Sequence, residues 1–234
     1  MSDFLHPKEE KCESEGESAL EKFRFNLERK DWTLEKEYKQ EGITIKSTYD
    51  EEAKAYFILT EALLDFEFEW LFLEMRDHTF EATPEWFSAC KKLTIVKRLT
   101  EVCWVVHEVL EPQLGGIVAS RDVVFHSHVR KIGKASFISL CSTEWPGMQS
   151  KKKIIRAEIV KGSGQTFSPD PDLATRTHLR WVMSVDYKIP LVPVKLLMPF
   201  HVETARQYVM GLKKYLAVRR DSRSGTVQDC VPKK

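Results

Sequence analysis

Residues 102–122 read VCWVVHEVLEPQLGGIVASRD, an apolar run followed by a Gly-Gly pair and a second apolar run. This pattern predicts two strands joined by a tight loop, because Gly115 and Gly116 can adopt the positive φ values that such a loop requires. The first run carries Glu108, and an ionised carboxylate that is buried without a partner costs several kcal/mol. Glu108 must therefore be paired, protonated or in contact with water.

Patterns typical of strands surround this stretch on both sides. We expect nine strands, at residues 33–38, 43–49, 55–63, 93–101, 102–111, 122–132, 135–142, 154–160 and 177–187. Turn residues separate the last six, as in an antiparallel meander. The Gly-Ser-Gly at residues 162–164 is interpreted as a plain turn.

Helices are expected on either side of this meander. A first helix is predicted at residues 18–29, a second at residues 66–77 with Asp65 as its cap, and a short third one capped by Thr83. A long helix of about 18 residues, or about 27 Å, is predicted from Phe200 onward. Its apolar seam is Met198, Val202, Ala205, Val209, Leu212 and Leu216, spaced by three or four residues.

The pattern as a whole predicts an α+β domain at residues 18–219, in which a curved antiparallel sheet of nine strands is closed by the long C-terminal helix. Residues 1–17 and 220–234 are expected to be disordered. Such an arrangement encloses either a solid core or a cavity, and the pattern does not distinguish the two.

Composition excludes several classes of function. A net charge of +1 without a clustered basic excess argues against a nucleic-acid partner. Five irregularly spaced cysteines argue against a disulfide framework and favour a cytosolic setting. No apolar stretch reaches the roughly 18 residues of a membrane span. Catalytic and nucleotide-binding motifs are absent, so we expect no enzyme activity and no cofactor.

Three further groups of residues are interpreted as structural. His126 and His128 have a spacing compatible with a metal, but a third ligand is not recognisable, so we expect solvent-facing histidines and no metal. Cys103 and Cys141 are expected to be inert buried thiols. Arg121 and Asp122 are interpreted as a local ion pair that fixes the start of a strand.

Five motifs in order resemble the StAR-related lipid-transfer (START) family, specifically its steroidogenic acute regulatory branch. They are DWTLEKEY, PEWFSACKKLTIVKRLTE, HEVLEPQLGGIVASRDVV, IIRAE and THLRWVMSVDYK. The resemblance implies a helix-grip fold, in which a U-shaped sheet and the C-terminal helix enclose a tunnel for one lipid molecule. It also implies that residues 111–121 and this helix form a gate.

The resemblance gives Glu108 a role as well. In this branch an acid on the fifth strand faces an arginine of the sixth strand inside the tunnel, and Glu108 falls on the acid position. Ser127 falls on the arginine position, a departure that favours a bulkier or less polar cargo than cholesterol, such as a carotenoid. Glu108 could then bind ordered water, have a raised pKa, or pair with His126 or His128 if the strand register shifts.

The residues expected to contact cargo follow from this resemblance and from strand and helix periodicity. They are Trp104, Val106, Glu108, Val123, Phe125, Ser127, Trp181, Met183, Met198, Phe200, Ala205, Val209 and Leu212. The expected gate residues are Leu114, Gly115, Gly116, Ile117 and Val118.

We therefore predict non-enzymatic binding and intracellular transfer of a single hydrophobic lipid, a sterol or a carotenoid or other isoprenoid. The alternative is a sensor that binds lipid to regulate a partner without transferring it. A monomeric cytoplasmic protein that makes transient contact with membrane surfaces is expected, because apolar residues in the gate loop suit such contact.

Overall fold

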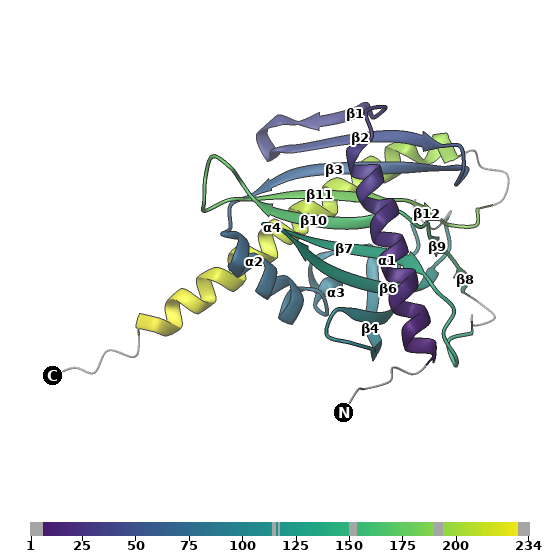
Figure 1. Cartoon of the computed structure of the whole chain (residues 1–234). Helices are drawn as coiled ribbons and strands as arrows, with labels where there is room; N and C mark the ends of the chain where they lie inside the picture. The colour runs from purple at the N-terminus through teal and green to yellow at the C-terminus, as the bar shows by residue number, and fades with distance from the viewer. Residues whose placement is uncertain (1–6, 114–115, 117, 150–153, 190–193, 229–234) are drawn as a thin grey trace.

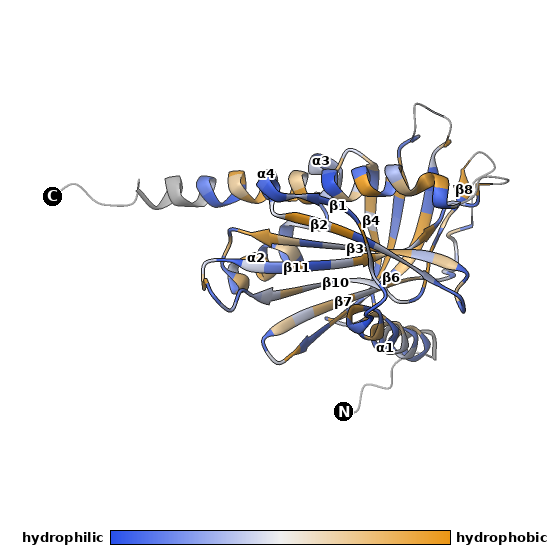
Figure 2. Cartoon of the chain, turned by 90° about the horizontal axis from the view of Figure 1, so that it is seen from above, coloured by the Kyte–Doolittle hydropathy of each residue, from blue (hydrophilic) through white to orange (hydrophobic). Residues whose placement is uncertain are grey.

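The structure, a computed structural model, describes residues 7–113, 116, 118–149, 154–189 and 194–228. Within these residues, nine strands form one antiparallel sheet in the order β1-β2-β3-β11-β10-β7-β6-β5-β4. The sheet curves, and helices α1 and α4 lie on its opposite sides (Figure 1 and Figure 2). We call the side toward α4 the inner face and the side toward α1 the outer face. The predicted α+β architecture is confirmed.

The strands of this sheet are β1 (Thr33–Tyr38), β2 (Ile43–Asp50), β3 (Ala55–Leu64), β4 (Cys90–Arg98), β5 (Cys103–Leu110), β6 (Arg121–Ile132), β7 (Ala135–Ser142), β10 (Ser163–Pro169) and β11 (Thr177–Met183). Short β8 (Ile155–Arg156) pairs in parallel with β6, and β9 (Glu158–Ile159) pairs with β12 (Val185–Asp186). The helical elements are α1 (Pro7–Glu28), η1 (Lys39–Glu41), α2 (Phe68–Glu74), the π-helical turn η2 (Met75–Thr79), α3 (Thr83–Trp86), η4 (Val194–Leu197) and α4 (Met198–Gln228).

One of the nine strands differs from the prediction. Residues 154–160 form β8 and β9, which lie outside the meander, whereas β10 occupies the central position between β7 and β11. The predicted plain turn at 162–164 is wrong, because Ser163 and Gly164 already belong to β10. The strand is polar in sequence, and it is buried because α1 covers one of its faces and α4 faces the other. Phe23 of α1 packs so closely on Gly164 that a Cβ there would overlap it.

Helix α1 is longer than predicted. Its apolar stripe, Leu20, Phe23 and Leu27, packs on the outer face as expected, but the helix begins at Pro7, within a segment that we expected to be disordered. Contacts with the sheet stabilise this added part. The thiols of Cys12 and Cys103 lie 3.9 Å apart, and Glu17 accepts a hydrogen bond from His128.

The covering helix also explains why the expectation of solvent-facing histidines is wrong. His126 and His128 point to the outer face beneath α1, where their exposed fractions are 1% and 0%. Among the described residues, no three His, Cys, Asp or Glu side chains gather in a group that could hold a metal ion.

The helix ends differ from the prediction for local reasons. Glu67 caps α2 in place of Asp65, since its carboxylate accepts hydrogen bonds from the backbone N–H groups of Glu69 and Trp70. Ala82 caps α3, and the Thr83 hydroxyl donates to the carbonyl oxygen of Phe80. Helix α4 continues to Gln228, through residues that we expected to be disordered.

Helix α4 packs its apolar seam on one part of the inner face. Val209, Leu212 and Leu216 are fully buried there against residues of β2, β3, β10 and β11 and against the segment from α2 to α3. None of the helices in the described part of the chain is both long and apolar enough to span a bilayer.

Helix α4 lies close to α3 at Gly211. A Cβ at this position would overlap the backbone carbonyl of Trp86. Gly211→Ala should therefore lower the free energy of unfolding by about 1–3 kcal/mol, whereas the same change in an exposed helix raises it by about 1 kcal/mol. Urea denaturation of the two proteins measures the difference.

Met210→Ala, at the adjacent and partly exposed position, is the matched control and should change the stability little. A Gly211→Ala variant as stable as the wild type would show that α4 and α3 do not depend on this contact.

Candidate functional site

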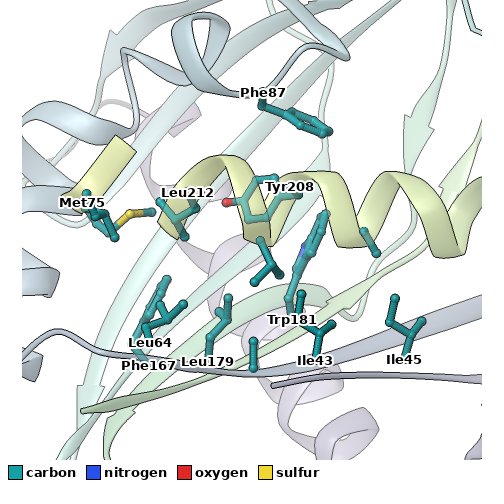
Figure 3. Packing of buried hydrophobic residues seen from close by; sticks show 14 of the residues in the cluster. Ile43, Ile45, Leu64, Met75, Phe87, Phe167, Leu179, Trp181, Tyr208 and Leu212 are labelled. Carbon is teal, nitrogen blue, oxygen red and sulfur yellow. The ribbon is translucent and has the colours of Figure 1, made fainter. Parts of the chain in front are cut away.

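A cavity of about 820 Å³ lies between the inner face of the sheet and the first three turns of α4. Its size falls in the range of about 300–1,000 Å³ that is typical of sites for small molecules. Most of its lining is apolar or aromatic. On α4 the lining ends at Tyr208, and from Val209 onward the space between helix and sheet is filled by side chains (Figure 3).

The structure brings nine of the thirteen predicted cargo-contacting residues to this cavity. They are Trp104, Glu108, Val123, Phe125, Ser127, Trp181, Met183, Phe200 and Ala205. Strand alternation explains the agreement, because every second residue of β5, β6 and β11 points to the inner face.

Four predicted residues do not line the cavity. Val106 lies in a packed cluster with Val123 and Phe125. Met198, Val209 and Leu212 belong to the large core cluster of the inner face. A helical seam marks the face that is turned to the sheet, but it does not distinguish the turns that pack on side chains from those that border a void.

Several cavity residues were missed. His201, Thr204 and Tyr208 share the cavity-facing side of α4 with Ala205. His201 and Tyr208 lie four and three residues from Ala205, and Thr204 lies three residues from His201 and four from Tyr208, so helical spacing could have identified all three. Gln165 lies on β10, the strand that the sequence pattern did not reveal, so no signal in the pattern could have placed it in the site.

Glu108 lines the cavity, and burial raises its pKa to about 7. The Cys90 thiol of β4 lies beside the carboxyl group, and its hydrogen bond opposes this shift. Of the three outcomes considered for Glu108, pairing with His126 or His128 is wrong, since both histidines lie on the opposite face of the sheet. The raised pKa makes the neutral acid a major form near pH 7.

The acid and the serine do not face each other across the strands. Val123 lies opposite Glu108, whereas Ser127 lies opposite Trp104. Four residues of β6 therefore separate the two positions, or about 13 Å along the strand. Both side chains nevertheless line the same cavity.

Three other titratable groups of the cavity wall are uncharged near neutral pH, although the lining also includes basic and acidic side chains such as Arg156 and Asp186. Burial lowers the pKa of His201 to about 4. Burial also raises the pKa values of Tyr187 and Tyr208 above their ordinary range, and the negative charge of Glu108 adds to both shifts. The imidazole and the two phenols can therefore offer hydrogen bonds without placing a fixed charge in an apolar space.

The predicted gate loop is described only in part, because Leu114, Gly115 and Ile117 lie outside the described residues. Gln113 lines the cavity and forms a β-bridge with Val118, which is buried. Gly116 has a φ of +92°, as expected for a tight turn.

The expected local ion pair between Arg121 and Asp122 is wrong, because neighbouring residues of a strand point to opposite faces. The Arg121 guanidinium donates to the carbonyl oxygens of Tyr187 and Ala119, both at 2.7 Å. Asp122 instead accepts two hydrogen bonds of 2.9 Å from Arg156. Arg121 thus attaches the end of the loop to the segment that precedes α4.

Known proteins share this architecture. Human StAR-related lipid transfer protein 5 superposes with a TM-score of 0.78 at 15% identity, covering 88% of this chain and 96% of that one. Human STARD10 superposes with a TM-score of 0.70 at 19% identity, covering 86% of this chain and 81% of that one. At these identities the likeness concerns the fold.

Proteins of similar sequence are also known. Steroidogenic acute regulatory protein, mitochondrial, from Oncorhynchus mykiss is 28% identical over 178 residues, which are 74% of this chain and 60% of that protein. The protein of the same name from Danio rerio is 30% identical over 121 residues, which are 50% of this chain and 41% of that protein. The matched regions thus span less than two thirds of these relatives. The START domain matches residues 16–215, and the chain belongs to the START domain family.

Proposed function

We propose that this chain binds one hydrophobic lipid in the cavity beneath α4 and transfers it between membranes without chemical change. The observation that carries the proposal is a mostly apolar cavity of about 820 Å³ inside a START domain. The names of its relatives, which include a lipid transfer protein, support the same function.

The hydrophobic effect is large enough to hold such a cargo. Each Å² of apolar surface that leaves water contributes about 25 cal/mol, so burying about 400 Å² contributes about 10 kcal/mol before the costs of binding. Because the lining provides shape and apolar contact, the proposed activity needs no catalytic group.

A sterol or an elongated isoprenoid such as a carotenoid is the proposed cargo. At the position where the steroidogenic acute regulatory branch is expected to carry an arginine, the cavity wall has the small side chain of Ser127. Removing a fixed positive charge and several side-chain atoms favours a cargo that is wider or less polar there than cholesterol. We also propose that the protein acts as a cytoplasmic monomer that touches membranes only transiently.

Mass spectrometry and an absorption spectrum of the purified protein, followed by transfer between donor and acceptor liposomes, test this function. We expect a bound sterol, or a visible band from a carotenoid, and transfer that rises with protein concentration. Binding without transfer would favour a lipid sensor, and absence of both would refute the proposal.

Uptake of cargo requires the cavity to open, and we propose that residues 111–121 move against α4 and the η4 segment before it. A reducible crosslink between Ala119→Cys and Leu196→Cys, which are exposed, should therefore lower the transfer rate by at least about tenfold. Cargo loaded beforehand should stay bound, because closure keeps it from water. Transfer is measured with liposomes before and after reduction.

Each single-cysteine variant treated with the same reagent is one control. The second control is a crosslinked Glu37→Cys and Thr44→Cys pair, because these two positions face each other on β1 and β2. Unchanged transfer in the crosslinked loop variant would contradict the proposed gate.

The raised pKa of Glu108 predicts that affinity depends on pH. A neutral lipid that displaces water makes the ionised carboxylate more costly, so the bound state favours the protonated acid. Affinity for a neutral sterol should accordingly fall by up to about tenfold from pH 6 to pH 8. Fluorescence titrations at several pH values measure this change.

Glu108→Gln keeps the size and the hydrogen bonding of the neutral acid, so its affinity should be independent of pH in this range. The nearby Cys90, Tyr187 and Tyr208 have raised pKa values and His201 a lowered one, so none of these four should titrate between pH 6 and 8. A wild-type affinity that does not change with pH would argue against a buried, titrating Glu108.

A further inference from the structure

A row of polar side chains crosses the inner face at the end of the cavity that borders the packed core. Trp181 of β11 lies directly opposite Thr60 of β3 and opposite Gln165 of β10. Tyr208 of α4 faces this row, and all four residues line the cavity. We call Thr60, Gln165, Trp181 and Tyr208 the polar belt.

The belt is buried and its geometry is fixed. The exposed fractions of Gln165, Trp181 and Tyr208 are 7%, 7% and 9%, and that of Thr60 is 1%. The ring of Tyr208 lies 4.2 Å from that of Trp181, centroid to centroid, and 5.2 Å from that of Phe87. Figure 3 shows Tyr208 and Trp181 side by side between α4 and the sheet.

The hydrogen-bonding groups of the belt are only partly used. The Gln165 amide donates a hydrogen bond of 2.7 Å to the Tyr208 hydroxyl oxygen, so the Tyr208 hydroxyl hydrogen remains available to an acceptor. The Trp181 indole N–H is buried and has no acceptor among the described residues. An indole nitrogen only donates, and a buried donor without an acceptor is costly and rare.

The geometry points to a cargo that carries an acceptor oxygen, such as a ketone or hydroxyl group, which receives hydrogen bonds from Trp181 and Tyr208 at the belt. A pure hydrocarbon would displace water from both donors without replacing it, and it would therefore bind more weakly. The inference rests on the proposed lipid binding and narrows it to oxygenated lipids. It also gives the cargo a direction, with its oxygen at the core-bordering end of the cavity.

A pair of probes that differ only in this oxygen tests the inference. The probes are 5α-cholestane and 5α-cholestan-3-one, each partitioned from liposomes into the protein. A comparison of β-carotene with its diketone, canthaxanthin, extends the test to carotenoid skeletons. The wild type should bind each oxygenated probe at least about tenfold more tightly than its hydrocarbon, as expected for two hydrogen bonds to buried donors.

Two conservative variants identify the donors. Tyr208→Phe removes only the hydroxyl group, whereas Trp181→Phe keeps an aromatic ring but also makes it smaller. Each variant loses one donor, so each should lower the preference for the ketone by about fivefold. Thermal denaturation with and without probe establishes that the variants are folded. Phe200→Leu, at the opposite end of the cavity, is the matched control. It should weaken the binding of both probes alike and leave the ratio of their affinities unchanged.

The outcomes separate this inference from the proposed function. If the wild type transfers lipid but binds ketone and hydrocarbon equally, the inference is overturned and lipid transfer stands. If neither variant changes the preference for the ketone, the belt does not supply the hydrogen bonds and the inference is also overturned. If the protein binds neither kind of probe and transfers no lipid, both proposals fail.

Discussion

Incomplete packing of α4 on the curved sheet is the constraint on which the rest of this structure depends. From Val209 onward, apolar side chains of the helix, the sheet and the segment from α2 to α3 fill the space between the layers. Before that point, from Phe200 to Tyr208, the same two layers enclose a cavity of about 820 Å³. The filled half holds the helix in place by hydrophobic burial, and this support allows the other half to stay open to a ligand.

Four buried titratable groups of the cavity wall are compatible with a dry interior around them because they are neutral, or largely neutral, near pH 7. Burial lowers the pKa of His201, raises those of Tyr187 and Tyr208, and brings that of Glu108 to about 7. A charged group in such a space would need a partner or water. The wall therefore provides apolar contacts, which do not distinguish one lipid from another. It also provides a few neutral hydrogen-bonding groups, which do distinguish between lipids.

The outer face of the sheet is covered by a helix, whereas the inner face borders the cavity. Helix α1 covers β10 and β11 with Phe23 and its neighbours, and it buries His126 and His128 of β6. The central strands are consequently covered on both faces, which explains why a sequence as polar as that of β10 lies in the middle of the sheet. Packing of α1 on the outer face therefore stabilises strands whose inner face borders the cavity.

The sequence by itself determined the fold class, eight of the nine strands of the sheet and most of the cavity-lining residues of β5, β6 and β11. Those features follow from local periodicity, since alternation along a strand decides which side chains share a face. Tertiary structure alone decided that β10 is a strand, that the two histidines are buried, and that Val209 and Leu212 pack in the core while Tyr208 and Gln165 meet at the cavity. The physical reason is that burial and cavity formation depend on which surfaces meet in space, and periodicity reports only the direction in which a side chain points.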